Sequence, residues 1–394
     1  MKAFGVQRCI DSMQIPIDGA QDERMGMKIF FGSLSGAGVA CMLFCVLDAA
    51  VAQAPNISVN VKSPEIGVFY FPGWRDNVKG QDEQKPWQRI QKFPERKPLL
   101  GWYQDGEDAV MRQQIAWMKE YGIDYVIFSW YWDGNQPWLG HAVKSFEKVN
   151  DEKMKFAVMW ANHGRAPQSG AFFYSMARYW IDNYFKRTDY LKIDGKPVAF
   201  IQMADSLDNK AKAFGSSAEE LVAKVRLMAV NAGLPGVYFV AGGGGGSILK
   251  NDRGEPKGFD AYFAYNYHTG PMGRTRGEKR GSRSYAEMDE AYQQHWRWMM
   301  EHANAPYILP LTSGWDKRPW GGSADPNHDH SIASPEEFAR HLKAARQVMQ
   351  KYPRKTLGMA TICCWNEFGE GSFIEPTEKQ RFIYLEQVKK SFSK

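Results

Sequence analysis

The segment 365–376 reads WNEFGEGSFIEP and directly follows a short apolar run, 358–364, near the carboxyl terminus of the 394-residue chain. It places two carboxylates, Glu367 and Glu370, three residues apart among glycines and aromatic residues. The apolar run is typical of a buried strand, and barrel enzymes carry their catalytic groups just beyond the carboxyl ends of such strands. We therefore interpret Glu367 and Glu370 as a catalytic acid/base pair at a strand end.

Two glutamates at this spacing also occur on the exposed face of a helix. Here Gly369 and Gly371 argue against a regular helix, because glycine is unfavourable in helix interiors. Glu375 is a weaker third candidate, which we expect either to fix the loop or to hydrogen-bond a substrate hydroxyl.

Strand-like runs alternate with helix-like runs along the rest of the chain. Strands are predicted where short apolar runs end in glycine, proline or polar residues, and helices where apolar residues recur every three to four positions. The predicted strands are 66–71, 125–129, 156–160, 197–202, 237–241, 261–265, 307–311 and 359–365, and the predicted helices are 107–121, 141–149, 171–185, 218–231, 285–302, 335–351 and 378–392. This alternation indicates one α/β domain over residues 55–394, a (β/α)8 TIM barrel with long βα loops.

Aromatic and polar residues gather at or near the predicted strand ends. Those ends meet on one face of a barrel, so we expect an aromatic-walled cleft with a polar floor. Aromatic residues make up 14% of the chain, with 14 tryptophans, and these either stack on sugar rings or fill a tryptophan-rich core. The predicted substrate-binding residues are Tyr70, Trp74, Trp130, Tyr131, Trp160, Asn162, His163, Gln202, Tyr267, His268, Trp315, Asp316 and Glu375.

Paired carboxyl groups on a sugar-stacking surface are the equipment of glycosidic bond cleavage. One carboxyl group protonates the leaving oxygen, and another group assists attack at the anomeric carbon. The segment 365–376 resembles the signature of family 99 glycoside hydrolases, the endo-α-1,2-mannosidases and mannanases, and of the family 99-like domains in bacterial cell-envelope polysaccharide loci. Segments 67–74 and 122–132 resemble those bacterial relatives too.

The resemblance implies a (β/α)8 barrel and a retaining, metal-independent enzyme that acts inside α-linked chains. It also implies that Glu367 is the base acting on the sugar's own 2-hydroxyl, which closes to an anhydro-sugar, and that Glu370 is the acid and then the base. Phe368 and Gly369 occupy positions where the mannosidases carry Trp and His, so the resemblance does not decide which sugar the substrate contains.

We expect an exported, retaining, endo-acting α-glycoside hydrolase that cleaves a bacterial or environmental polysaccharide. Two alternatives remain: an envelope polysaccharide glycosyltransferase or transglycosylase, and a non-catalytic carbohydrate-binding barrel. The net charge of +6 favours acidic glycans or envelope surfaces as partners. The basic loop 274–283 is either a solvated run of charges or a site for the acidic groups of a polysaccharide. Nucleic acid is not an expected partner, since the basic residues form no recognisable module. We expect a monomer.

No cofactor and no metal are expected. His163 and His268 lack partners at ligand spacing, which favours hydrogen bonds to sugar. The cluster 328–330, His-Asp-His, is a weaker alternative for a metal site, although the neighbouring Pro-Asn pair suggests an exposed loop.

Residues 1–54 are interpreted as an N-terminal extension followed by a signal peptide. The segment from Met27 is mostly apolar and ends in Ala-Gln-Ala at 52–54, a small-x-small cleavage site, with Met25 or Met27 as the true start. The mature chain would then begin near Pro55 and be periplasmic or secreted. The apolar run is short for a span, so we expect no stable membrane anchor.

The chain has five cysteines, of which only Cys363 and Cys364 follow this leader. Neighbouring cysteines inside an apolar strand are interpreted as small core hydrophobes. A disulfide framework or a metal site would need a different spacing.

Overall fold

The computed structural model describes residues 63–81, 84–163, 167, 169–243, 257–267 and 281–393. The predicted leader, His268 and residues 274–280 of the basic loop 274–283 lie outside these ranges. Among the residues described, no helix combines the length and the apolar character needed to cross a bilayer.

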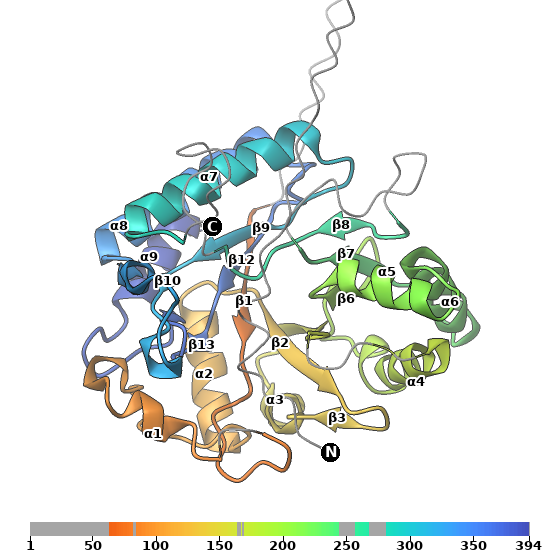
Figure 1. Ribbon diagram of the computed structural model, residues 1–394, viewed down its shortest axis with the longest axis horizontal. Coiled ribbons are helices and arrows are strands. Elements are labelled where there is room, and N and C mark those ends of the chain that lie inside the picture. Colours follow the sequence, from red (N-terminus) through yellow and green to blue (C-terminus); the bar gives the residue numbers. More distant parts are fainter. Residues whose placement is uncertain are drawn as a thin grey trace, which may run out of the picture. The chain divides into compact units, whose positions relative to one another are not determined.

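Eight parallel strands form the central sheet of the described chain (Figure 1). Their order in the sheet is β8-β7-β6-β4-β2-β1-β12-β9, so each parallel strand lies beside the next one along the chain, except that the first strand, β1, pairs with the last, β12. The bounds are β1 Glu65–Tyr70, β2 Tyr125–Trp132, β4 Lys155–Trp160, β6 Lys196–Ile201, β7 Tyr238–Ala241, β8 Ala261–Tyr262, β9 Leu309–Thr312 and β12 Met359–Cys363.

The sheet closes between its two end strands. Tyr262 of β8 forms a parallel bridge with Tyr307, just before β9. The Tyr262 amide donates to the Pro306 carbonyl at 2.8 Å, and the Ile308 amide donates to the Tyr262 carbonyl at 2.9 Å. The fold is therefore the predicted (β/α)8 barrel.

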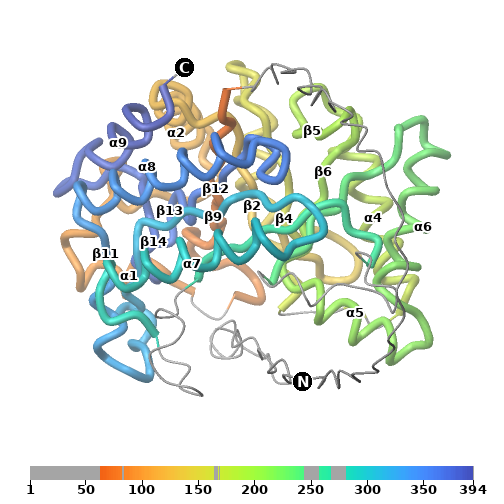
Figure 2. Tube along the Cα trace, turned by 90° about the horizontal axis from the view of Figure 1, so that it is seen from above, coloured from red at the N-terminus to blue at the C-terminus, as the bar shows by residue number. Residues whose placement is uncertain are grey.

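Helices lie around the outside of the strands, and α8 and α9 run side by side (Figures 1 and 2). The described chain also contains four short helical turns, which are the 3₁₀ turns η2, η4 and η5 and the π-helical turn η3. The helices are α1 Trp87–Ile90, α2 Asp108–Glu120, α3 His141–Val149, α4 Gly170–Trp180, α5 Ala204–Ala213, α6 Ala218–Asn231, α7 Tyr285–His302, α8 Pro335–Lys351 and α9 Ile383–Phe392, and the turns are η2 Pro94–Arg96, η3 Ile181–Phe185, η4 Arg318–Trp320 and η5 Pro326–His330.

Four predicted helices, 141–149, 218–231, 285–302 and 335–351, match α3, α6, α7 and α8 residue for residue. Ser217 and Ser284 cap α6 and α7, each accepting a backbone N–H from the first turn. The predicted cap of α8 is present as a full capping box. Helix α5 follows β6 immediately and was not predicted, while the last predicted helix, 378–392, begins only at Ile383.

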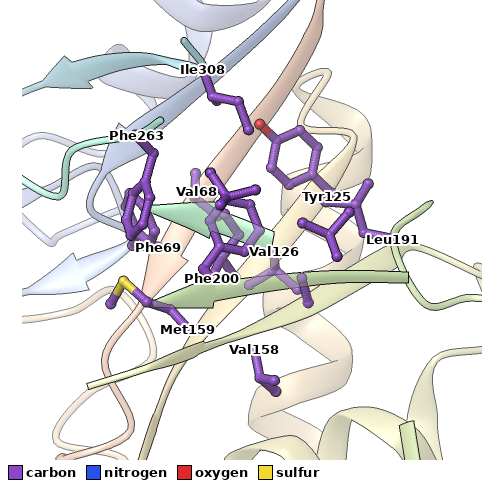
Figure 3. Close-up of a cluster of buried hydrophobic side chains, with 14 of the residues drawn as sticks. Val68, Phe69, Tyr125, Val126, Val158, Met159, Leu191, Phe200, Phe263 and Ile308 are labelled. Atoms are coloured by element: carbon purple, nitrogen blue, oxygen red, sulfur yellow. The ribbon is translucent and has the colours of Figure 1, made fainter. Parts of the chain in front are cut away.

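Side chains from several strands fill the interior of the barrel (Figure 3). The ring of Phe263, just after β8, lies 5.8 Å from that of Phe69 on β1 and 5.1 Å from that of Phe200 on β6. Because β1 and β8 are not neighbours in the sheet, these contacts cross the barrel. The interior is thus a packed core, on which the strand ends are held rigidly.

Most of the tryptophans belong to this core rather than to the surface. Four of the 14 are half-buried and the rest are buried. The buried ones are Trp74, Trp87, Trp117, Trp130, Trp132, Trp160, Trp180, Trp296, Trp315 and Trp365. Of the two roles that the composition allowed, the tryptophan-rich core therefore accounts for the larger number.

Short antiparallel strand pairs lie at the carboxyl ends of the barrel strands. β3 (Pro137–Trp138) pairs with the end of β2, and β10 (Gly314–Trp315) pairs with β11 (Ser331–Ile332). After β12 the chain forms a hairpin of β13 (Asn366–Glu367) and β14 (Ser372–Phe373), which we call the glutamate hairpin. At the opposite end of a strand, β5 (Lys192–Ile193) pairs with the start of β6.

Cys363 and Cys364 are joined by a disulfide, with a cis peptide between them. Both residues are fully buried, as expected for core positions. The prediction that they are unbonded core hydrophobes was wrong, because it looked for partners at a distance in the chain and passed over the adjacent residue.

Candidate active site

The two candidate catalytic residues lie on the glutamate hairpin, directly beyond the carboxyl end of β12. Glu367 pairs with Ser372 across the hairpin, and the Glu370 amide donates to the Glu367 carbonyl at 3.2 Å. Gly371 has φ +71°, and a Cβ there would lie 2.8 Å from the Asp316 amide nitrogen. The hairpin therefore requires glycine at this position, and the pair does not lie on an exposed helix.

Glu367 is 6% exposed and accepts a hydrogen bond from a tyrosine hydroxyl. The hydroxyl of Tyr265, just beyond β8, donates to its Oε1 at 2.6 Å. Burial raises the pKa of Glu367 well above its ordinary value, the negative charge of Glu370 raises it further, and the hydrogen bond from Tyr265 opposes both.

Glu370 is 9% exposed and faces a cation. Burial raises the pKa of Glu370 to about 7, while the positive charge of Lys317 opposes the rise. Two interacting carboxyl groups titrate as a pair. Because both pKa values are raised, the pair takes up protons at a higher pH than ordinary glutamates do.

Tyr131 at the end of β2 faces both glutamates. Burial raises the pKa of its phenol, and the charges of Glu367 and Glu370 add to the rise. Its ring meets that of His163 edge to face, with centroids 6.2 Å apart. Nδ1 of His163 is 2.9 Å from Oε1 of Gln202, and burial lowers the pKa of His163. Tyr131 and two predicted residues that follow β4 and β6, His163 and Gln202, thus form a chain of contacts that begins beside the pair.

The base of the glutamate hairpin is clamped to the end of β1 by Asn366. Its side-chain amide accepts from the Phe71 amide at 2.8 Å and donates to the Phe71 carbonyl at 2.9 Å. The indole of Trp74 donates to the Asn366 carbonyl at 2.8 Å and stacks on Trp87, with centroids 4.3 Å apart. Trp74 is 0% exposed, so in this structure it supports the hairpin from below.

Glu375 joins a buried hydrogen-bond network. Its carboxylate accepts from the Tyr103 hydroxyl at 2.7 Å and from the Gln114 amide at 2.9 Å. The Tyr70 hydroxyl lies 3.1 Å from Oε1 of Gln114 and donates to Asp105 at 2.6 Å. Burial raises the pKa of Glu375 to about 8 and that of Asp105 to about 7. Of the two roles expected for Glu375, these contacts supply the one that fixes the loop.

Asp316 and Trp315 are also buried, at 0% and 3% exposure. The Asp316 carboxylate accepts from the guanidinium groups of Arg96 and Arg318. The Trp315 indole donates to Ser323 at 3.1 Å. Both predicted ligands of the substrate therefore have protein partners in this structure.

The remaining predicted residues lie deeper or further round the barrel. Trp130 donates to the Tyr184 hydroxyl at 3.2 Å, and the ring of Trp160 packs in the core. Asn162 clamps the backbone of Met203 with two hydrogen bonds. The half-buried Tyr267 binds through its hydroxyl to the hydroxyl of Tyr307.

Two groups that act on the pair, one by a hydrogen bond and one by its charge, were absent from the predicted set. Tyr265 was counted as the last residue of a strand, although its hydroxyl is the hydrogen-bond donor to Glu367. Lys317 sits in a run of charges that the sequence does not distinguish from a solvated loop, yet its side chain is only 6% exposed. The position of Tyr265 at a strand end was the one signal that could have identified it.

No group of three His, Cys, Asp or Glu residues suited to a metal occurs in the described part of the chain. In the cluster 328–330, the Asp329 carboxylate accepts from the Lys317 amide at 2.9 Å and from Ser323. Nδ1 of His328 lies 2.8 Å from the Ser282 carbonyl. This cluster thus holds the loop that carries Lys317.

Comparison with solved structures shows the same fold. A "glycoside hydrolase-like protein" is 17% identical with a TM-score of 0.60, over 84% of this chain and 94% of that one. The family 99 endo-α-mannosidase from Bacteroides thetaiotaomicron is 16% identical with a TM-score of 0.55, over 83% of this chain and 96% of that one. The resemblance to family 99 proteins is therefore confirmed in the fold.

Among curated proteins, the chain is 22% identical over 319 residues to "Uncharacterized protein WxcX" of Xanthomonas campestris pv. campestris, in strains B100 and ATCC 33913. The match covers 75% of this chain but only 43% of the relative, so the chain spans less than half the length of these relatives. A family model described as "Glycosyltransferase WbsX" matches residues 74–388, which include the glutamate hairpin and most of the barrel. The chain belongs to this family.

Proposed function

We propose that this protein cleaves glycosidic bonds within an α-linked polysaccharide, with Glu367 and Glu370 as its acid/base pair. The observation that carries the proposal is the buried pair itself, at the carboxyl end of β12, with both pKa values raised. A pair in this state can give a proton and take one near neutral pH, as glycosidic cleavage requires.

The roles follow the resemblance to family 99. Glu367 removes the proton from the sugar's 2-hydroxyl as O2 attacks C1, and Glu370 protonates the leaving oxygen as the C1–O bond breaks. In the second step Glu370 takes a proton from water, the water attacks C1 as the C1–O2 bond breaks, and Glu367 returns its proton to O2. The overall stereochemistry is retention, because C1 is attacked twice.

The first step requires Glu367 in its ionised form. In the free protein burial and the charge of Glu370 raise the pKa of Glu367, which disfavours that form. The hydrogen bond from Tyr265 favours the ionised form of Glu367, and a hydrogen bond from the 2-hydroxyl of a bound sugar would favour it further. We propose that, with substrate bound, Glu367 is ionised and Glu370 carries the proton.

The substrate we propose is a carbohydrate, and an α-mannan comes first because the solved family 99 neighbour is an endo-α-mannosidase. Tyr131 faces the pair, and His163 and Gln202 are linked to it in a chain of contacts, so we propose these three predicted ligands as the groups that bind the sugar. Phe368 and Gly369 replace the Trp and His of the mannosidases, so other α-glycans and acidic bacterial polysaccharides belong in the same screen.

The test is a product screen. Residues 55–394 are incubated with α-mannan, α-glucans and acidic polysaccharides, and new reducing ends are followed beside the Glu370→Gln variant. Oligosaccharides from one substrate, absent with the variant, are the expected result. Product release that is unchanged in Glu370→Gln would remove this residue from its proposed role.

Glycosyl transfer is the second candidate, because the family model is described as a glycosyltransferase. The same pair could pass the sugar to a hydroxyl of another glycan in place of water. Adding an acceptor oligosaccharide to the screen separates the two, since transfer extends the acceptor without releasing reducing ends. Tight glycan binding with neither product would identify the third possibility, a carbohydrate-binding barrel.

We further propose that the protein is exported after removal of residues 1–54. The support is the apolar segment ending in a small-x-small site at 52–54. Expression of the full chain in a Gram-negative host, followed by N-terminal sequencing of the product, should give Pro55 as the first residue. An uncleaved chain retained in the cytoplasm would refute export.

A further inference from the structure

A buried arginine reaches the glutamate hairpin from a distant part of the chain. Arg96 ends the 3₁₀ turn η2 and is 1% exposed. Its Nη1 donates to the Phe368 carbonyl at 2.7 Å and to the Asp316 carbonyl at 3.1 Å, and its Nη2 binds the Asp316 carboxylate. Removing a guanidinium group from water is costly unless hydrogen-bond acceptors are well placed around it. We therefore infer that this position requires the planar arrangement of N–H donors that arginine provides.

Asp316 completes the connection to Glu370. Its backbone amide donates to the Glu370 carbonyl at 2.7 Å, and its carboxylate is 0% exposed between Arg96 and Arg318. Arg96 and Asp316 together therefore hold the hairpin at Phe368 and at Glu370, on both sides of Gly369. The ring of contacts joins η2, the loop after β10 and the hairpin.

Lys317 is carried by the same ring. It follows Asp316 directly, its amide donates to the Asp329 carboxylate at 2.9 Å, and its side chain is 6% exposed. The ammonium group is the cation that faces Glu370 and opposes the effect of burial on the pKa of that carboxyl group. The charged and titratable groups that face Glu370 are Glu367, Lys317, Tyr131 and Tyr265.

We propose that Arg96 is a positioning residue, which acts through Asp316 to hold the Lys317 ammonium against the Glu370 carboxyl group. This inference rests on the proposed acid/base role of Glu370 for its functional meaning, but not for its test. Arg96 touches neither carboxyl group of the pair. In this proposal Arg96 fixes the distance between the Lys317 ammonium group and the Glu370 carboxyl group, whose pKa the ammonium group lowers.

The test is a carboxyl titration that needs no substrate. The protein is labelled with ¹³C at the glutamate side-chain carboxyl groups, and the Glu370 resonance is identified by its absence from Glu370→Gln. Lys317→Met should raise the midpoint of Glu370 by about 1 pH unit, because an opposite charge is lost. Arg96→Lys keeps the charge but loses the fork, and should raise the midpoint by a similar amount.

Two further variants separate positioning from a general loss of packing. Arg96→Lys combined with Lys317→Met should raise the midpoint no more than the larger single change, since both act through one ammonium group. Arg318→Lys is the matched control, because Arg318 binds the same Asp316 carboxylate but makes no contact with the hairpin carbonyls. Its Glu370 midpoint should equal that of the wild type.

A wild-type midpoint in Arg96→Lys, with a raised midpoint in Lys317→Met, would overturn the proposal. If Arg96→Lys does not fold, Asp316→Asn replaces it: the amide bond to Glu370 is kept, the charged tie to Arg96 is lost, and the same rise is expected. A protein that cleaves no glycan yet shows these midpoints would refute the hydrolase and leave the positioning role intact. Where a glycan is cleaved, Arg96→Lys should lower kcat about tenfold with KM within about twofold.

Discussion

The hydroxyl of Tyr265 donates a hydrogen bond of 2.6 Å to Oε1 of Glu367. Tyr265 follows β8 and Glu367 follows β12, with β9 between these strands in the barrel. The bond therefore ties the glutamate hairpin to a different sector of the barrel and favours the ionised form of Glu367.

Tyr265→Phe should lower turnover by roughly tenfold to a hundredfold, because a hydrogen bond to a charged group contributes about 1.5–3 kcal/mol. The measurement is the initial rate of reducing-end release. Tyr262→Phe is the control, since that hydroxyl binds Asn304 at 2.9 Å away from the pair. Equal rates in the two variants would show that the bond has no part in the reaction.

Glu367→Gln and Glu370→Gln should each lower turnover by at least about a hundredfold, because each removes a proton-transfer group without a large change in shape. Circular dichroism and melting temperature confirm that the variants are folded. A wild-type rate in either variant would exclude that residue from proton transfer.

The buried network around Glu375 should make the protein less stable as the pH rises. A carboxyl group whose pKa is raised on folding, here to about 8, binds more protons in the folded state than in the unfolded state. Stability is therefore full below the unfolded pKa, near 4.3, and is lost as the pH rises through about 8. The loss should amount to a few kcal/mol.

Glu375→Gln should remove that part of the pH dependence. At pH 5 the variant should lie within about 1 kcal/mol of the wild type, because glutamine resembles the protonated acid at the Tyr103 and Gln114 contacts. At pH 9 its free energy of unfolding should exceed that of the wild type. Urea unfolding at both pH values decides this, and parallel losses in the two proteins would contradict the raised pKa.

Gly369→Ala should displace either the hairpin or Trp320. A Cβ at this position would lie 1.8 Å from the indole nitrogen of Trp320, so the neighbour must move. Overpacking of this kind costs about 1–3 kcal/mol. Trp320→Ala should relieve it, so the double variant should lose less stability than the sum of the single variants in urea unfolding. Strict additivity would show that the two residues do not meet.

Much of the fold could be predicted from sequence because its signals are local. Helices with apolar residues on one face and a serine cap, such as 218–231 and 285–302, were predicted without error. Strand ends were predicted less well: β8 stops at Tyr262 and β12 at Cys363, each before the predicted end. Strand ends depend on pairing with distant residues, which a local pattern does not contain.

The site shows the same division. Glu367 and Glu370 could be proposed as an acid/base pair from their spacing, the flanking glycines and aromatic residues and the preceding apolar run, whereas their separate roles came from the resemblance to family 99. Trp74 and Asp316 have the residue types of a sugar site, but the structure places them beneath the hairpin, where Asn366 and Arg96 are their partners. Whether a strand-end side chain points at a ligand or at the core depends on segments hundreds of positions away, as the link between Arg96 and Phe368 illustrates.

Both glutamates lie on one hairpin, so the proposed proton donor and proton acceptor belong to the same short segment and move together. The groups proposed to recognise the glycan, Tyr131, His163 and Gln202, stand on three other strand ends. Under the proposed function, exchange of those loops would change which glycan is accepted while the spacing of the two glutamates stays the same. In evolutionary terms, the proposed proton-transfer groups lie on a single segment, whereas the proposed substrate-binding groups are distributed over several loops.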